Sequence, residues 1–154
     1  MKKIVPFIIG SLLIVSAIGC QDTAKTSSDA PNNTTENATA PDAQTAQQIK
    51  NDATSEIRRD QLNSDIRARE QRNNVTGGDA DRTDGDLQSE VRSKLEANLP
   101  ASKLGVEAED GAVTVVGTVP TEEQLQRIEP LAKEIKGVQS VKVDAKVAPA
   151  QPAN

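Results

Sequence analysis

The chain has 154 residues, enough for one ordinary domain with extensions or for two very small domains. It carries 18 basic and 23 acidic residues and contains no His, no Trp, no Tyr and a single Phe. This acidic, aromatic-poor composition argues against nucleic-acid binding, which uses basic surfaces and stacking rings. Without His the chain lacks the commonest general base and metal ligand, so we expect no catalysis, metal or cofactor.

Residues 1–19 are typical of an export signal peptide. Lys2 and Lys3 precede an apolar stretch over residues 4–18, shorter than the roughly 20 apolar residues of a membrane-spanning helix. The stretch ends in Ala17-Ile18-Gly19-Cys20, which resembles the bacterial lipobox, in which the cysteine becomes the mature N-terminus and carries lipid. The same residues also fit ordinary signal cleavage, and Ala17 stands where the lipobox favours Leu.

Cys20 favours the lipoprotein interpretation. It is the only cysteine, lies directly after the expected cut, and would otherwise be an unpaired thiol in an oxidising compartment. The sequence therefore predicts lipid attachment at Cys20 and a membrane-anchored lipoprotein that faces the periplasm or the cell exterior. Gln21 rather than Asp follows Cys20, which by analogy with enteric bacteria favours the outer membrane.

Three non-globular segments are expected between this cysteine and the first strongly periodic helix. Residues 20–43 are small and polar, which predicts a disordered tether. Residues 44–73 predict a partly helical basic arm, with Ile49, Ala53, Ile57, Leu62 and Ile66 as a thin apolar stripe. Residues 74–85 are rich in Gly, Asp and Asn and predict a flexible linker. If all of this were coil, its reach would be about 45 Å.

The arm has two interpretations. Its five arginines suit contact with anionic lipid head groups, wall polymer or a partner helix. Alternatively, the arm is a solvated, partly helical spacer.

Residues 86–148 predict a small α+β module of order α-β-β-α-β. Leu87, Val91, Leu95 and Leu99 recur every four residues, which predicts a helix with Asp86 as its N-cap. Leu104, Val106 and Ala108 alternate with polar residues as in a strand. Asp110-Gly111 then predicts a hairpin into the β-branched strand 112–119.

A second helix and a last strand complete this module. Thr121 and Gln124 form a capping-box pattern, Lys136-Gly137 a typical helix end, and Pro130 either kinks the helix or divides it. The last strand places Val141, Val143, Ala145 and Val147 inward and Lys142, Asp144 and Lys146 outward. We expect a three-stranded mixed sheet packed on two helices, with residues 149–154 as a disordered tail.

Two short motifs in this module resemble the BON domain, named after bacterial osmotic-stress and nodulation proteins. The first runs from Asp110 and Gly111 through Val113 to Gly117, and the second joins Gly137, Val138 and Val141. The resemblance implies the α-β-β-α-β fold and an exported or membrane-associated, non-enzymatic protein that binds phospholipid or maintains envelope integrity. We expect structural roles for the three glycines: Gly111 in the hairpin, Gly137 at a helix end, and Gly117 at a bulge or under a closely packed helix.

Two functions remain open at this stage. In the first, a lipid-anchored cell-envelope protein uses its BON-like domain to bind phospholipid head groups and support envelope integrity or the stress response. In the second, the chain is a spacer or protein-interaction lipoprotein that docks an envelope protein without recognising lipid.

Overall fold

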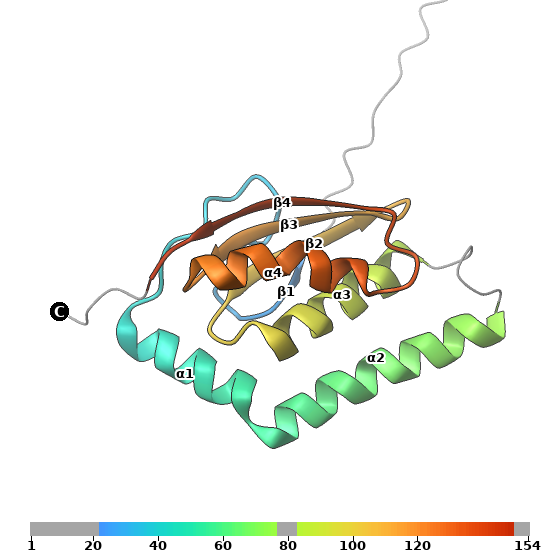
Figure 1. Ribbon diagram of the computed structural model, residues 1–154, viewed down its shortest axis with the longest axis horizontal. Helices are drawn as coiled ribbons and strands as arrows, with labels where there is room; N and C mark the ends of the chain where they lie inside the picture. The colour runs from blue at the N-terminus through green and yellow to red at the C-terminus, as the bar shows by residue number, and fades with distance from the viewer. Residues whose placement is uncertain (1–21, 77–82, 150–154) are drawn as a thin grey trace, which may run out of the picture.

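The computed structural model describes residues 22–76 and 83–149 (Figure 1). In chain order its elements are β1 (Ala24–Lys25), α1 (Ala43–Thr54), α2 (Glu56–Thr76), α3 (Asp84–Asn98), β2 (Lys103–Glu109), β3 (Ala112–Val119), α4 (Glu122–Lys133) and β4 (Ser140–Val147). The predicted signal peptide, the lipid attachment at Cys20, residues 77–82 of the predicted linker and residues 150–154 of the predicted tail lie outside this range. No helix within it is both long enough and apolar enough to cross a bilayer.

A mixed sheet of order β1-β2-β3-β4 forms the centre of the fold. β2 and β3 form the predicted antiparallel hairpin, whereas β3 and β4 are parallel and are connected through α4. The predicted α+β class is therefore confirmed. The sheet has four strands rather than three, because two residues of the segment predicted to be disordered add β1 to the free edge of β2.

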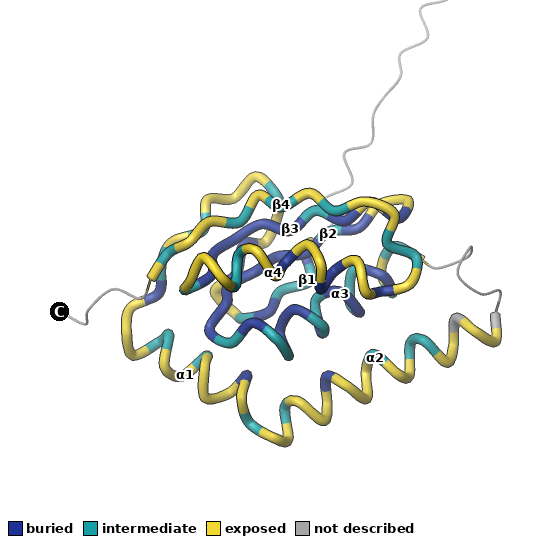
Figure 2. Tube along the Cα trace, in the orientation of Figure 1, coloured by how far each residue is buried: buried dark blue, intermediate teal, exposed yellow. Residues whose placement is uncertain are grey.

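The hydrophobic core lies between one face of the sheet and the helices α3 and α4 (Figure 2). The four-residue repeat of α3 is fully buried: Leu87, Val91, Leu95 and Leu99 are each at most 2% exposed. Val113 and Val115 of β3 meet them, and the inward positions of β4 pack against the same cluster as half-buried residues. Val147 follows this register opposite Val119 but is 36% exposed, because β4 is an edge strand.

The helix ends correct three sequence predictions. Thr83, not Asp86, is the N-cap of α3, and its hydroxyl accepts the Asp86 N–H at 3.2 Å. Thr121 caps α4 as predicted, but the side-chain amide of Gln124 donates to the Pro100 carbonyl instead of completing the capping box. α4 remains one helix around Pro130 and ends at Lys133, so the predicted Lys136-Gly137 end lies in the turn beyond it.

The segment predicted as a disordered tether packs against the module. The Thr26 N–H donates to the Leu104 carbonyl at 2.8 Å, and the Thr26 hydroxyl accepts the Leu104 N–H at 2.9 Å. Thr23, Thr26 and Ala30 are buried as a result. The segment is ordered because the edge strand β2 has free backbone N–H and C=O groups with which it can form hydrogen bonds. A segment so poor in apolar residues could not be ordered by hydrophobic burial.

The same segment covers part of the sheet face opposite the helices. Gly105 lies beneath it: a Cβ there would come within 2.8 Å of both the Pro31 carbonyl oxygen and the Thr23 hydroxyl. Val116 on this face is only 3% exposed. The segment thus covers the outer face at β2 and β3, whereas the outward side chains Lys142, Asp144 and Lys146 of β4 remain exposed.

The predicted arm consists of two helices that meet at Ser55, and α2 lies along α3 (Figure 1). Leu62 is 1% exposed and is the largest buried side chain of the arm. Ile57 leaves the predicted stripe and is 76% exposed. α2 continues to Thr76, so the first residues of the predicted linker are helical.

Candidate functional site

The two BON-like motifs, far apart in sequence, meet at one end of the sheet. The parallel pairing of β3 and β4 places Val113 directly opposite Val141. The Gly111 carbonyl accepts the Gln139 N–H at 2.8 Å, joining the hairpin to the segment that follows the turn at Gly137. A carboxylate oxygen of Asp84, at the start of α3, accepts the Asp110 N–H at 2.9 Å.

The backbone of this cluster explains its residue types. Asp110 and Gly111 have consecutive positive φ values of 50° and 81°, as a tight two-residue hairpin requires. Gly137 also has a positive φ. Val113 is buried, and Val138 and Val141 are half-buried against the core. These motif residues hold the hairpin, the turn and the sheet together.

Gly117 lies apart from the cluster, further along β3. The ladder runs regularly through its pair with Leu104, so neither a bulge nor a closely packed helix, as predicted, accounts for it. A Cβ would instead overlap the carbonyl oxygen of Lys103 on the neighbouring strand, and its φ is +124°. Gly117 is therefore required by the close approach of two strands.

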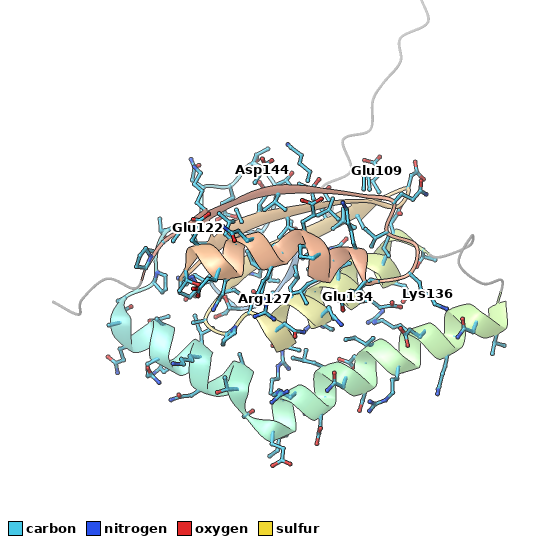
Figure 3. The ribbon with its side chains drawn as sticks, viewed as in Figure 1. Glu109, Glu122, Arg127, Glu134, Lys136 and Asp144 are labelled. Atoms are coloured by element: carbon cyan, nitrogen blue, oxygen red, sulfur yellow. The ribbon has the colours of Figure 1, made fainter. Side chains whose placement is uncertain are left out.

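Several charged side chains of the module lie on different elements. Figure 3 shows Glu109 on β2, Glu122 and Arg127 on α4, Glu134 just beyond α4, and Asp144 on β4. In the part of the chain that the structure describes, no three His, Cys, Asp or Glu side chains lie where they could hold a metal ion.

Several open hollows flank the module, and two of them border its outer sheet face and the edge at Pro100 and Pro120. One of about 460 Å³ lies between residues 34–38 and the outer sheet face at Val116 and Lys146. The other, of about 470 Å³, is more apolar and lies between α1 and the edge formed by Pro100 and Pro120. The Oε1 atom of Gln124, which lines this second hollow, is buried without a hydrogen-bond partner.

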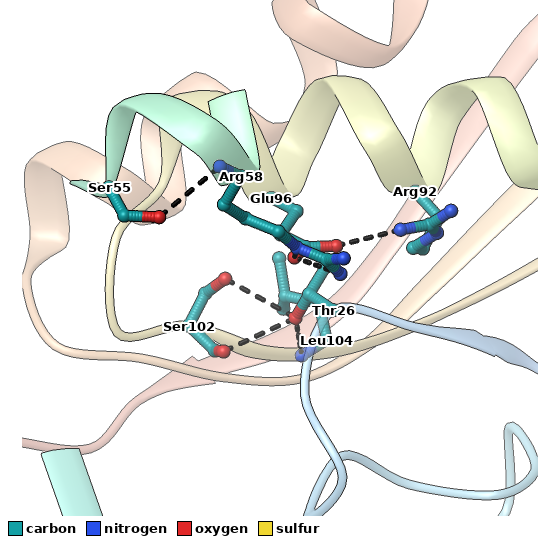
Figure 4. Close-up of polar contacts among 7 residues, drawn as sticks. All are labelled: Thr26, Ser55, Arg58, Arg92, Glu96, Ser102 and Leu104. Atoms are coloured by element: carbon teal, nitrogen blue, oxygen red, sulfur yellow. Dashed lines mark hydrogen bonds and ion pairs between the residues drawn. The ribbon is translucent and has the colours of Figure 1, made fainter. Parts of the chain in front are cut away.

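An ionic contact between α2 and α3 is the main polar site that sequence reasoning missed. Glu96 is 4% exposed and accepts Arg58 at 2.6 Å and Arg92 at 2.8 Å (Figure 4). At the other end of α3, Asp86 pairs with Arg69 at 2.6 Å and with Arg72 at 3.6 Å.

A signal for this contact exists in the sequence. Arg58 and Arg69 are 11 residues apart and Asp86 and Glu96 are 10 apart, so both pairs span about 15 Å of helix. Two helices with matched, oppositely charged pairs can pack side by side. Two arginines of the basic arm thus contact the module of the same chain. The two interpretations of the sequence had placed them elsewhere, either on lipid, wall polymer or a partner helix, or in solvent.

Taken together, these features define a small α+β module built around a hairpin and a parallel crossover strand. Residues 83–149 match the family model for the BON domain, so this part of the chain is a BON domain, as the resemblance predicted. A 60-residue stretch is 43% identical to Osmotically-inducible protein Y of Escherichia coli (strain K12) and covers 38% of this chain. The chain thus matches only 30% of the length of that relative. No solved structure gives a significant match.

Proposed function

We propose that this chain is an exported, non-catalytic protein of the cell envelope that acts in the response to osmotic stress. The observation that carries the proposal is the BON domain, with its likeness to an osmotically inducible protein, behind a sequence typical of a signal peptide and lipobox. Lipid on Cys20 anchors the chain to a membrane, and the outer membrane is favoured. The anchored chain faces the periplasm or the cell exterior. At that membrane the BON domain binds phospholipid.

The position of the fold relative to Cys20 supports action at the membrane surface. Thr23 is already buried against the sheet, three residues after Cys20. Three extended residues span at most about 10 Å, against the reach of about 45 Å expected for a disordered tether. An anchored module is therefore held against the bilayer, where a weak affinity for lipid suffices because its effective concentration is on the order of millimolar or higher.

Mass spectrometry of the mature N-terminus, combined with membrane fractionation, tests the anchor. We expect an acylated Cys20 and a membrane-bound chain, and release of the Cys20→Ser variant into the soluble fraction. An unacylated N-terminus on a chain that washes freely from the envelope would refute anchoring.

Flotation of the acyl-free Cys20→Ser chain with phospholipid vesicles tests the lipid-binding half separately. We expect weak co-flotation of this untethered chain. When the chain is tethered to the vesicle through an artificial lipid, we expect BON-domain amides to gain protection from hydrogen exchange, and the absence of any such gain would refute lipid binding.

A second candidate is docking of an envelope protein, and the charge of the module favours it. Residues 83–149 contain 12 acidic and 8 basic side chains, a net charge of −4. Lysines at three places already face carboxylates: Lys94 faces Glu134, Lys133 faces Glu129 and Lys142 faces Asp144. An anionic bilayer repels such a surface. A single dominant protein adduct after crosslinking in cells would support docking, whereas adducts to lipid alone would contradict it.

A further inference from the structure

The face of α2 that packs on α3 has an apolar centre and basic ends. Arg58, Leu62, Ile66 and Arg69 follow one another at spacings of four, four and three residues, which places them on one side of the helix. Leu62 is 1% exposed and Ile66 half-buried at the centre of the contact. The arginines at its ends reach the carboxylates of Glu96 and Asp86.

This combination is also what a helix needs in order to lie on an anionic bilayer. The apolar centre enters the boundary between head groups and acyl chains, while flanking arginines bind lipid phosphates. Over its length α2 carries five arginines and four carboxylates, so its attraction to a bilayer is local to this face. Because α3 and a bilayer would use the same side chains, α2 cannot contact both at once.

The contact with α3 is suited to such competition. Leu62 is the only large apolar side chain of α2 that is fully buried among the described residues. The side chains of the Arg69–Asp86 pair are 28% and 23% exposed, and partly exposed pairs stabilise little. The Arg58–Glu96 pair is the more buried of the two, so we expect α2 to separate first at its Arg69 end.

We propose that α2 is a membrane-binding helix that α3 keeps masked, and that anionic phospholipid competes with Asp86 and Glu96 for Arg58 and Arg69. The inference rests on the proposed function, in which the chain lies at a membrane. To the lipid contact proposed for the BON domain it adds a second contact by the arm, whose arginines face the bilayer once they are released. The docked arm is then the resting state, and bilayer contact favours its release.

The test uses the chain from residue 20 onward with Cys20→Ser, which keeps every described residue and carries no acyl chain. Binding is measured by flotation with phosphatidylethanolamine vesicles that contain or lack phosphatidylglycerol. The variant Asp86→Asn with Glu96→Gln removes both carboxylates that mask the arm. The matched control, Glu122→Gln with Glu123→Gln, removes the same charge from exposed positions on α4.

We expect the unmasked variant to bind phosphatidylglycerol vesicles about tenfold more tightly than the matched control, because two arginines become available to the bilayer. The gain should disappear on vesicles without phosphatidylglycerol and when Arg58→Gln and Arg69→Gln are added. Hydrogen exchange should show that α2 loses protection in the unmasked variant while β3 keeps it. If β3 also loses protection, Asp86→Asn alone, at the more exposed pair, replaces the double variant.

The outcomes separate this inference from the proposed function. Equal binding of the unmasked variant and the matched control would refute masking while leaving lipid binding by the BON domain in place. No binding by any variant would refute masking, while exchange protection on the tethered chain would still decide lipid binding by the BON domain and the N-terminal mass spectrum would decide the anchor.

Discussion

Replacing Gly117 with Ala tests how closely β2 and β3 approach each other. At a φ of +124° a side chain is strained, at a cost of about 1–3 kcal/mol. The added Cβ would also overlap the Lys103 carbonyl oxygen and lie 3.1 Å from the Leu104 Cα. The two strands must separate there, which weakens backbone hydrogen bonds worth about 1 kcal/mol each. We therefore expect a loss of about 3 kcal/mol, a large part of the stability of so small a module.

Urea unfolding followed by far-ultraviolet circular dichroism measures this loss, since the chain has no Trp for fluorescence. Gly85→Ala is the matched control, because a Cβ at Gly85 in α3 would meet nothing within 4 Å. Helix propensity favours Ala there by up to about 1 kcal/mol, so the control should be neutral or stabilising. If Gly117→Ala unfolds at the same urea concentration as the original chain, the close strand approach described here is wrong.

Three further predictions concern the segments packed around the BON domain. Thr26→Val leaves the Leu104 N–H without its acceptor, so we expect a loss of about 1–2 kcal/mol in urea unfolding, and an unchanged midpoint would contradict β1 docking. Leu62→Ala should weaken arm docking by about 2–3 kcal/mol, seen as faster amide exchange in α2 with unchanged exchange in β3. Hydrogen bonds from the N–H and hydroxyl of Thr45 lower the pKa of Asp42, the N-cap of α1, below its ordinary value of 3.8. This stabilisation is present above that value and is lost as the pH falls through the lowered pKa. The protection factors of α1 amides, which compare observed exchange with the intrinsic rate at the same pH, should therefore fall at acid pH in the original chain but not in Asp42→Asn.

The sequence was sufficient for the module because its signals are local. The four-residue repeat from Leu87 to Leu99 specifies which side of α3 faces the core, whatever the helix packs against. Asp110-Gly111 specifies a hairpin because its residues adopt positive φ values at low cost. The lipid on Cys20 stays a prediction, because that residue lies outside the described part of the chain.

Sequence reasoning failed where order comes from distant partners. Residues 22–38 contain almost no large apolar side chain, so their composition predicts disorder. In the structure, however, Thr26 forms hydrogen bonds with Leu104 at the free edge of β2, about 80 positions later in the chain. The helix boundary was misplaced because both Thr83 and Asp86 can act as caps, and Arg69 on another helix engages the Asp86 side chain.

The α-β-β-α-β module, its inward faces and its turns can be predicted from the residues alone, since periodicity and backbone preference act over a few positions. The fourth strand formed by a polar segment and the packing of the arm on α3 become visible only in the folded molecule. Hydrogen bonds to a strand edge and ion pairs between helices depend on groups that come together only after the module has folded. Such contacts do not require a periodic pattern of residues, so sequence periodicity does not reveal them.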